Sequence, residues 1–467
     1  MQTICASSTA PGGAIGIIRV SGDNAIETTS RIFKGKTPLD QAKGYTLHYG
    51  EIPGIDDVLV IVYRTPHSYT GEDSTEIMCH GSNYIMQRIL ELLMNEGCAM
   101  ARPGEYTQRA FLNGKMDLSQ AEAVADLIAS GNAATHRLAM SQMRGGFSSE
   151  LRKLRDKLLE MTSLLELELD FSEEDVEFAD RQTLLALAEN IDTTISRLVD
   201  SFRTGNAIKN GVPVAIIGET NVGKSTLLNC LLHEDKAIVS DIHGTTRDSI
   251  EDTISIQGIM FRFIDTAGIR ETNDRIEQMG IERSWAKADN AEIVLLVTDT
   301  REFNVDRSHL EGNERLEGNE RLEGNERLEE SVHLEASSHL EGKKVIRVYN
   351  KADLNGQTTG RLGENSVAIS AKQGLGIDSL EQMLVQAASV TNVSDSDIIV
   401  TNVRHVEALR HALSAIRKVE HQLNDNMSGD IISMDLHDCI DALAEIVGDV
   451  TSEDTLRSIF SHFCIGK

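Results

Sequence analysis

The chain has 467 residues, more than one hydrophobic core usually supports, so we expect two to four domains. The formal net charge of −28 argues against a broad cationic surface for nucleic acid, so any RNA contact would use local basic patches. The six cysteines form no Cys-x-x-Cys pair, which indicates reduced thiols instead of a zinc site or a disulfide framework. No apolar run approaches the ~18 residues of a membrane span and no secretory signal is visible, so a soluble, cytoplasmic protein is expected.

Residues 1–117 mix short β-rich runs such as AIGIIRV and DVLVIVYR with Gly and Pro punctuation and one helical stretch near YIMQRILELLM. This pattern is typical of an α+β domain. From Ser119 onward apolar residues repeat at helical spacing, and one stripe carries Leu154, Leu158 and Leu165. We interpret the stripe as a bundle core and not as a cofactor site, and assign residues 118–211 to the first part of a helical domain.

Short apolar strands (VAII, FRFID, EIVLLVTD, KVIRVYN, SVAIS) alternate with helical segments in residues 212–382. That alternation predicts a parallel sheet covered by helices. The pattern is helical again after about Asp397, so residues 383–467 are predicted to complete the helical domain around an inserted α/β domain. Residues 310–341 hold an acidic RLEGNE repeat with ten Glu and three Arg, which we interpret as a solvated insertion of unknown role.

The segment GETNVGKS, residues 218–225, matches the phosphate-binding pattern G-x-x-x-x-G-K-[ST]. It stands between the strand VAII and the helical STLLNCLL, which is the context that the motif requires. Gly218 and Gly223 would let backbone N–H groups surround phosphate, Lys224 would reach the β- and γ-phosphates, and Ser225 would bind Mg²⁺. The alternative is a chance match in an ordinary turn.

Two segments that could complete a phosphate and Mg²⁺ site argue against chance. DTAG (265–268) follows the strand FRFI, so that Asp265 would hold Mg²⁺ through water and the Gly268 amide would sense the γ-phosphate. GTTRD (244–248) lies between GETNVGKS, which we call the P-loop, and DTAG. It offers Thr246 as the second hydroxyl for Mg²⁺.

Two further segments predict that the base is guanine. NKAD (350–353) follows the strand KVIRVY, and Asp353 suits guanine because N1–H and N2–H₂ both donate to one carboxylate, whereas adenine presents an acceptor. SAK (370–372) follows the strand SVAI, where a backbone amide can meet the guanine oxygen. GETNVGKS is followed along the chain by GTTRD, DTAG, NKAD and SAK. Together and in this order, these segments predict a GTP site.

Several longer segments carry a more specific signal: TICASSTAPGGAIGIIRVSG at the start, SYTGEDSTEIMCHG, ARPGEYTQRAFLNGKMDLSQAEAVADLI, and the final FCIGK. Together with the GTPase motifs, they make nearly the whole chain resemble the tRNA modification GTPase family MnmE, also called TrmE. The resemblance implies a multidomain fold that combines α+β, all-α and α/β parts. These are an N-terminal folate-binding and dimerisation domain, a split helical domain, and an inserted Ras-like P-loop GTPase domain.

The resemblance also implies an activity. Members hydrolyse GTP to GDP and phosphate in a K⁺-dependent way and work with an FAD-dependent partner, MnmG or GidA, as a heterotetramer built on a homodimer. Together they add an aminomethyl or carboxymethylaminomethyl group to carbon 5 of the wobble uridine of certain tRNAs. The one-carbon unit would come from 5-formyltetrahydrofolate or a related tetrahydrofolate. Which tRNAs are modified, which folate is the donor and how far the G domain moves cannot be read from the sequence.

The resemblance places folate contacts on Arg19, Glu76, Lys115 and Lys467. A carboxylate such as Glu76 can accept the paired donors of a pterin edge, and the basic residues can bind folate oxygens and glutamyl carboxylates. The alternative for each is a solvated surface charge. In the CIGK tail, Cys464 is functionally relevant by the same resemblance, and its alternative is a buried, inert thiol.

Catalysis needs a residue that acts on water, and Ile269, where many small GTPases have glutamine, cannot do so. The resemblance assigns this role to Glu277, whose alternative is an exposed carboxylate on a helix surface. A K⁺ ion would offset the charge that an arginine finger neutralises in other GTPases. The oxygen ligands implied for this ion are Asn221, Ser240, Ile242 and Thr245.

The full set of expected GTP contacts comes from the P-loop, the loop that ends in GTTRD, DTAG, NKAD and SAK: Asn221, Val222, Gly223, Lys224, Ser225, Thr226, Ser240, Asp241, Ile242, His243, Gly244, Thr245, Thr246, Asp265, Thr266, Ala267, Gly268, Asn350, Lys351, Ala352, Asp353, Ser370, Ala371 and Lys372. Two other functions compete with the modification enzyme: a regulatory switch GTPase of ribosome assembly, and a folate-binding scaffold with a vestigial G domain. The N-terminal segments and the tail argue against the first, and the complete GTPase motifs argue against the second.

Overall fold

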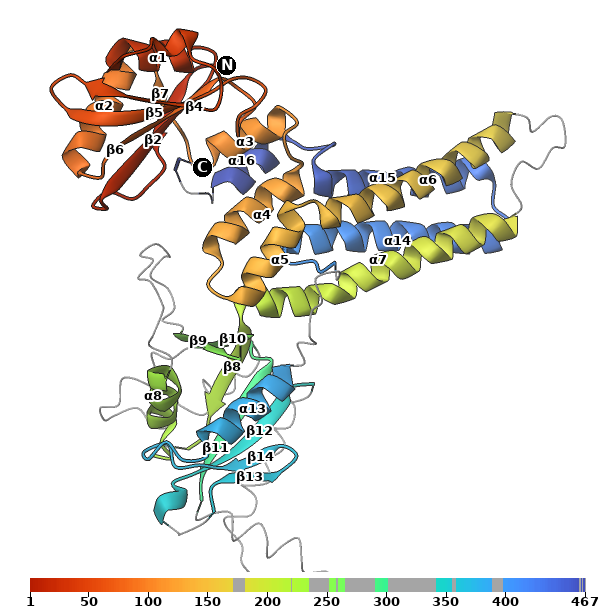
Figure 1. The fold of residues 1–467 in the computed structure, drawn as a ribbon. Coiled ribbons are helices and arrows are strands. Elements are labelled where there is room, and N and C mark those ends of the chain that lie inside the picture. Colours follow the sequence, from red (N-terminus) through yellow and green to blue (C-terminus); the bar gives the residue numbers. More distant parts are fainter. Residues whose placement is uncertain are drawn as a thin grey trace, which may run out of the picture. The chain divides into compact units, whose positions relative to one another are not determined.

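The computed structural model divides into two compact units (Figure 1). The first unit comprises Met1–Ala129, Ala139–Ser196 and Arg404–Lys467, and the second comprises Ser130–Leu138 and Arg197–Val403. The residues that the structure describes are 1–170, 181–219, 221–234, 252–257, 259–264, 290–300, 342–354, 358–388, 398–461, 463, 465 and 466. The RLEGNE insertion lies outside them.

The first unit begins with a seven-stranded sheet in the order β3-β4-β5-β6-β2-β1-β7. All neighbouring strands are antiparallel except β1 and β7. The strands are β1 (Ile4–Ser7), β2 (Ile15–Ser21), β3 (Lys34–Gly35), β4 (Thr46–Ile52), β5 (Asp56–Tyr63), β6 (Ser74–His80) and β7 (Ala99–Met100). Helices α1 (Ala25–Ile32) and α2 (Asn83–Asn95) pack on one face of this sheet, over Ile18, Val60 and Ile77.

The other face of this sheet, which we call the outer face, carries the residues that alternate with the core positions. One row across the strands runs Leu47, Ile61, Glu76, Arg19, and the next contains Tyr49 and Leu59. Leu47 and Tyr49 are 54% and 67% exposed. On β4 and β5 the outer face thus carries a group of apolar residues beside the exposed Glu51 and Asp57, and on β6 and β2 it carries a charged pair.

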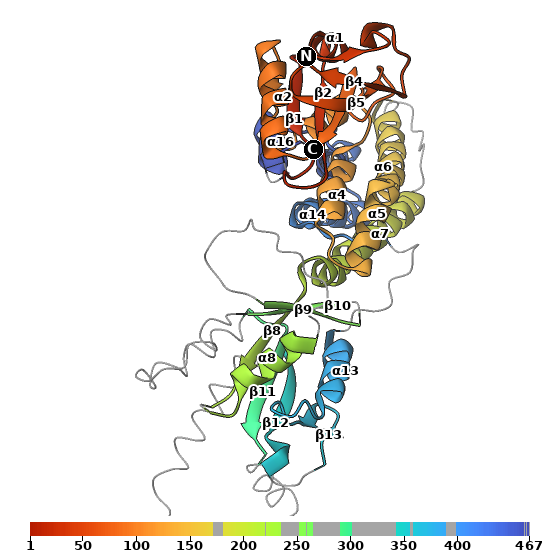
Figure 2. The same ribbon diagram turned by 60° about the vertical axis from the view of Figure 1, so that its left-hand side comes forward.

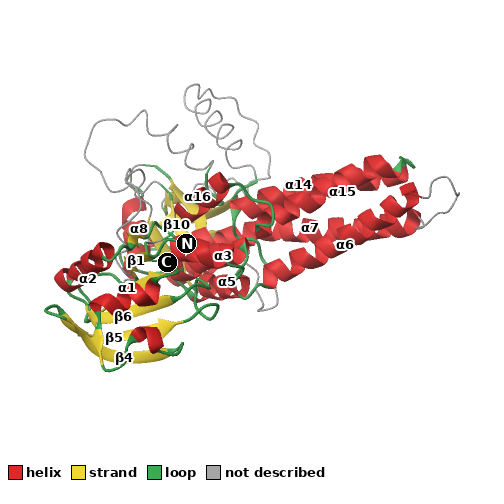
Figure 3. Ribbon diagram, turned by 90° about the horizontal axis from the view of Figure 1, so that it is seen from above, coloured by secondary structure: helices red, strands yellow, loops and turns green. Residues whose placement is uncertain are grey.

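Helices form the rest of the first unit. They are α3 (Glu105–Leu112), α4 (Leu118–Ala129), α6 (Gly146–Asp170), α14 (Val403–Asn424), α15 (Gly429–Val447) and α16 (Glu453–Ser461), joined by α5 (Ala133–Met143) and α7 (Arg181–Asn210), parts of which belong to the second unit. Helices α6, α7, α14 and α15 run side by side (Figure 3). The predicted stripe on α6 is buried at Leu154, Leu158 and Leu165, which confirms its assignment to a bundle core.

A buried ion cluster ties α4 to the start of α14. Arg404 donates from Nε and Nη2 to the two carboxylate oxygens of Glu122 at 3.0 Å each, and from Nη1 to the Glu445 carbonyl at the end of α15 at 2.8 Å. Nε2 of His405 lies 2.6 Å from the Glu122 carboxylate. Burial alone would raise the pKa of Glu122, but hydrogen bonds and charge from His405 and Arg404 outweigh it and lower that pKa to about 2.

The second unit contains the α/β domain, whose sheet has the order β13-β14-β12-β11-β8-β10-β9. The strands are β8 (Val212–Ile217), β9 (Asp252–Ile256), β10 (Ile259–Phe263), β11 (Ile293–Asp299), β12 (Lys344–Asn350), β13 (Gly360–Gly363) and β14 (Ser366–Ala368). Helices α8 (Lys224–Glu234) and α13 (Ile377–Ala388) lie beside this sheet (Figure 2). Their buried side chains share one core with Val214, Leu295 and Val348.

The five strands predicted for this sheet are present as β8, β10, β11, β12 and β14, and they are parallel to one another. The expectation of a wholly parallel sheet is wrong at its edges, because β9 and β13 pair in an antiparallel sense. The β9 sequence DTISI alternates buried and exposed residues, which suits an edge strand with one face toward solvent.

Two expectations about the whole chain concern thiols and membranes. The five described cysteines are free, as their spacing predicts. Among the described helices, none is both long and apolar enough to cross a bilayer. The domain boundaries at residues 117, 211 and 382 stay predictions, although α7 ends at Asn210 and β8 begins at Val212.

The Glu122 cluster predicts an acid-dependent stability. Glu122→Gln should lower the free energy of unfolding of the first unit at pH 7 by at most roughly 3 kcal/mol, because a neutral amide compensates Arg404 poorly. The ionised carboxylate contributes fully above the pKa of an unfolded Glu, about 4.3. Its contribution is lost as the pH falls toward the folded pKa of about 2.

The difference between parent and variant should therefore shrink between about pH 5 and pH 2. Urea unfolding followed by far-ultraviolet circular dichroism measures it, with the exposed Glu160→Gln on α6 as the matched control. A pH-independent difference would show that ionisation of Glu122 does not stabilise the helical bundle.

Candidate functional site

The P-loop connects β8 to α8 and needs glycine at two positions. A Cβ atom on Gly218 would lie 2.1 Å from the Val297 carbonyl oxygen, and one on Gly223 would lie 2.4 Å from Nδ2 of Asn350. Gly223 also has a φ of +97°, and Asn221 one of +64°, both in the left-handed region. The loop thus packs against the ends of β11 and β12 too closely for other residues.

The side chains at the start of α8 have the chemistry that a polyphosphate requires. Lys224 Nζ donates to the Gly218 and Glu219 carbonyls at 2.7 and 2.6 Å, so its ammonium group lies within the loop. Ser225 is half-buried and Thr226 exposed in the first turn of α8. The N-terminus of a helix favours an anion through its N–H groups and its dipole. The role of Ser225 as a Mg²⁺ ligand stays a prediction.

One buried amide joins the three loops of this site. Asn350 is 3% exposed; its Nδ2 donates to the Val222 carbonyl at 2.8 Å, and its Oδ1 accepts from the Ala371 N–H at 3.0 Å. Its backbone carbonyl accepts from the Thr300 N–H at 2.8 Å. Asn350 therefore holds the P-loop, NKAD and SAK segments together.

The carboxylate predicted to read the base contacts the SAK segment. Asp353 Oδ1 accepts a hydrogen bond of 2.7 Å from Ser370 Oγ, which leaves the half-buried carboxylate oriented beside the SAK loop. The Ala352 N–H donates to the Ile369 carbonyl at 3.0 Å, so the NKAD backbone is anchored to the strand before SAK. Ala371 is buried and Lys372 exposed next to this pair.

One charged contact of this region was not anticipated from the sequence. Lys351, with a φ of +65°, places Nζ 3.1 Å from Oδ2 of Asp299, the last residue of β11. Asp299 is buried, so the pair fixes Lys351 against the neighbouring strand. The available signal was the acidic end of the predicted strand EIVLLVTD, since parallel strands bring their carboxyl ends to one edge of the sheet.

The predicted catalytic residue and many of the predicted GTP and metal contacts lie outside the described part of the chain. They are Glu277, the DTAG residues Asp265, Thr266, Ala267 and Gly268, and the loop residues Ser240, Asp241, Ile242, His243, Gly244, Thr245 and Thr246. Among the expected ligands of Mg²⁺ and K⁺, Ser225 and Asn221 belong to the residues that the structure describes. The roles of all these residues stay predictions.

Two of the four predicted folate contacts form a pair on the outer face of the first unit's sheet. Arg19 donates from Nε and Nη2 to Glu76 Oε1 at 2.9 and 2.8 Å. The phenol of Tyr63 donates to Glu76 Oε2 at 3.2 Å. The Arg19 guanidinium carbon lies 5.4 and 5.6 Å from the ring centres of Tyr69 and Tyr106, which restricts it on two sides.

The other two predicted folate contacts are not in that pair. Lys115 donates from Nζ to the Pro66 carbonyl at 2.9 Å, in the loop that also carries Tyr69. Lys467 and Cys464 lie outside the described residues, but Gly466 between them accepts from Ser8 Oγ at 3.4 Å. The C-terminal tail therefore reaches the end of β1, two strands from Glu76.

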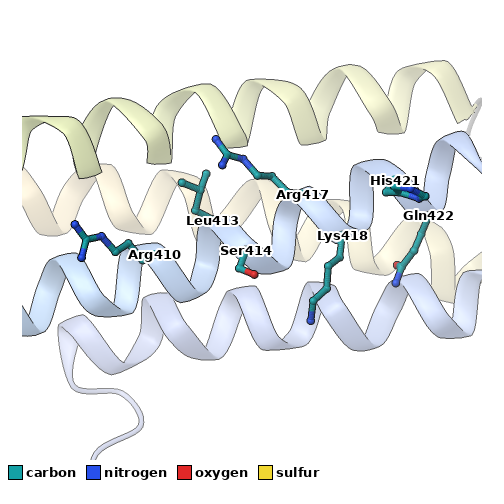
Figure 4. Close-up of a pocket in the computed structure, with 7 residues that line it drawn as sticks. All are labelled: Arg410, Leu413, Ser414, Arg417, Lys418, His421 and Gln422. Carbon is teal, nitrogen blue, oxygen red and sulfur yellow. The ribbon is translucent and has the colours of Figure 1, made fainter.

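A groove of about 530 Å³ on α14 carries basic side chains, including Arg410, Arg417 and Lys418 (Figure 4). Arg417 pairs with Asp192 at 2.8 Å and Lys418 with Asp435 at 3.3 Å. These carboxylates offset most of the groove's positive charge, so we assign it no role in binding phosphate.

Comparison with known proteins shows the family. Residues 3–115 match the family model described as the GTP-binding protein TrmE N-terminus. Residues 118–464 match the family model described as the MnmE helical domain. The chain belongs to the MnmE family of tRNA modification GTPases. Membership makes it a GTP-binding GTP hydrolase that acts in tRNA modification.

Relatives in the MnmE family match over their full length. The tRNA modification GTPase MnmE of Bacteroides thetaiotaomicron is 59% identical over 100% of this chain and 99% of its own. That of Parabacteroides distasonis is 56% identical over 100% of both chains, and that of Porphyromonas gingivalis is 49% identical over 100% and 98%. Among solved structures, the G domain of the FeoB iron transporter of T. maritima is similar to this chain at 21% identity, over 38% of this chain and 99% of its own. The TM-score is 0.23, so nothing is concluded from this similarity.

The central amide predicts a test of the nucleotide site. Asn350→Ala should weaken binding of a fluorescent GDP at least ~10-fold, because the Val222 carbonyl and the Ala371 N–H would lose their partner and the loops their alignment. The stability of the G domain should also fall, by roughly 2 kcal/mol. Asn365→Ala, an exposed asparagine of the same unit, is the matched control. Unchanged GDP affinity would mean that Asn350 does not align the loops.

Proposed function

We propose that this protein is a K⁺-dependent GTPase that works with the FAD-dependent protein MnmG to modify carbon 5 of the wobble uridine of certain tRNAs, using a tetrahydrofolate one-carbon unit. The observation that carries the proposal is that one chain holds two separate sets of ligand-binding groups. The Asn350-linked loops suit GTP, and the Arg19–Glu76 pair on the N-terminal sheet suits a pterin. A regulatory GTPase would need only the first.

At the nucleotide site, each described residue has a defined task. Lys224 exchanges its two loop carbonyls for the β- and γ-phosphates, which accept more strongly because they are charged. The hydroxyl oxygen of Ser225 would coordinate Mg²⁺, and the positive charge of this ion would offset the negative charge of the phosphates. Asp353, oriented by Ser370, accepts N1–H and N2–H₂ of guanine and leaves adenine without a partner.

At the folate site, the carboxylate of Glu76 would accept the amidine edge of the pterin, and the nearby cations would bind the oxygens of 5-formyltetrahydrofolate or a relative. Lys115 and the tail residue Lys467 would contact the acidic glutamyl end. The attachment of Gly466 to Ser8 supports this assignment, because it brings the tail to the same sheet.

The homodimer of the proposal uses the N-terminal domain. The exposed apolar residues Leu47 and Tyr49 on the outer face support a contact there between two copies, since burying them stabilises association. A heterotetramer with MnmG, and a cytoplasmic location, complete the proposal.

Nucleoside analysis tests the function directly. Transfer RNA from cells that lack this protein should have lost the aminomethyl-derived groups on its wobble uridines, and mass spectrometry of digested tRNA measures them. Restoration by the parent gene is the control. Unchanged wobble uridines together with abnormal ribosome profiles would instead support the switch GTPase of ribosome assembly.

Catalysis by Glu277 and K⁺ gives a second test. GTP hydrolysis should be fast in K⁺ and slow in Na⁺ at equal ionic strength, because the smaller ion fits the same oxygens poorly. Glu277→Ala should lower kcat roughly 30- to 150-fold without weakening GTP binding, since the residue acts on water. Steady-state phosphate release in each salt measures both. A parent that ignores the salt and a variant with full kcat would exclude this mechanism.

A further inference from the structure

The Glu76 carboxylate is partly occupied before any ligand arrives. Its Oε1 accepts two N–H groups of Arg19, and its Oε2 accepts the O–H of Tyr63. A carboxylate oxygen has two acceptor positions, so Oε2 keeps one open, and Oε1 gains one when Arg19 releases one of its two N–H bonds. A pterin edge presents two parallel donors and can use both oxygens only if Glu76 is held at a suitable angle.

Tyr63 is the residue that holds Oε2. It stands at the end of β5, diagonal to Glu76 on the outer face, and is half-buried. Burial raises the pKa of Tyr63, the neighbouring Glu76 charge raises it further, and Arg19 opposes part of this. The phenol therefore remains protonated at neutral pH and acts as a donor.

The ring of Tyr63 is itself supported. Tyr45 meets it edge to face, with ring centres 5.6 Å apart and planes at 87°. Tyr45 has a φ of +60°, a conformation that is unfavourable for a bulky residue, and its N–H donates to the Val62 carbonyl at 2.8 Å. Such strain persists where surrounding contacts maintain it and is often found at binding sites.

We propose that Tyr63 is a positioning residue of the folate site, whose phenol holds Oε2 of Glu76 so that the carboxylate faces the amidine edge of the pterin. The inference rests on the proposed folate function and adds to it a residue that acts through Glu76. Arg19 fixes one oxygen and Tyr63 the other, so the two together set the plane of the carboxylate.

Isothermal titration calorimetry with 5-formyltetrahydrofolate tests the proposal. Tyr63→Phe removes the hydroxyl, keeps the ring, and should weaken binding roughly 10-fold, as expected for a hydrogen bond to a charged group. Tyr84→Phe, at an exposed tyrosine of α2 on the opposite side of the sheet, is the matched control and should change binding less than about 2-fold. Circular dichroism and sedimentation velocity confirm that each variant is folded and keeps the parent's oligomeric state.

A second ligand separates positioning from a merely structural role. In an analogue with hydrogen in place of the 2-amino group, the pterin offers Glu76 one donor instead of two. If Tyr63 acts through Glu76, Tyr63→Phe should weaken the analogue much less than it weakens the parent ligand.

The outcomes are distinct. Equal weakening for both ligands, or no weakening of either, would overturn the role of Tyr63 and leave the folate site in place. Failure of the parent protein itself to bind 5-formyltetrahydrofolate would overturn the folate assignment and, with it, this inference.

Discussion

The amide of Asn350 is the contact on which the nucleotide site depends. If the loops separated, the buried Asn350 amide, the Val222 carbonyl and the Ala371 N–H would all lose their hydrogen-bond partners. The conformation of each of the three loops is therefore stable only when the other two are in place. This makes one cooperative structure of the P-loop, which we propose binds phosphate, and the NKAD and SAK loops, which we propose read the base. Glycine at position 223 belongs to the same arrangement, because any side chain there would occupy the space of the amide.

The proposed folate site follows the same principle with charges. Arg109, itself buried, donates to Glu72 at 3.2 Å and to Glu105 at 2.9 Å, and Glu72 accepts a further bond from Ser21 Oγ at 2.8 Å. This network ties α3 to the loop that carries Tyr69, and Tyr106 of α3 donates to the Arg19 carbonyl at 2.7 Å. The surroundings of Arg19 are thus built on interactions that are costly to break one at a time. Exposed ion pairs, such as those along α14, contribute much less.

Local patterns in the sequence predicted what depends on local physics. The five central strands of the α/β domain, the bundle stripe on α6 and the strand–loop–helix context of GETNVGKS follow from hydrophobic period and from the residues on either side. The antiparallel edge strands β9 (DTISI) and β13 (GRLG) were missed because they have only two apolar side chains and one, respectively. Edge strands depend on the neighbour that they pair with, which a local pattern does not contain.

By itself, the sequence determined the residue types that a GTP site and a family resemblance require, because these are properties of motifs and of their order along the chain. Only the tertiary structure decided which of those residues meet. The register of β2 and β6 set Arg19 opposite Glu76, and the order β8-β11-β12 brought Asn350 to the P-loop and Asp299 to Lys351. These pairs are separated by 57, 128 and 52 positions in the chain. Their distances are fixed by strand pairing and packing, which act across the fold and leave no mark in the local sequence.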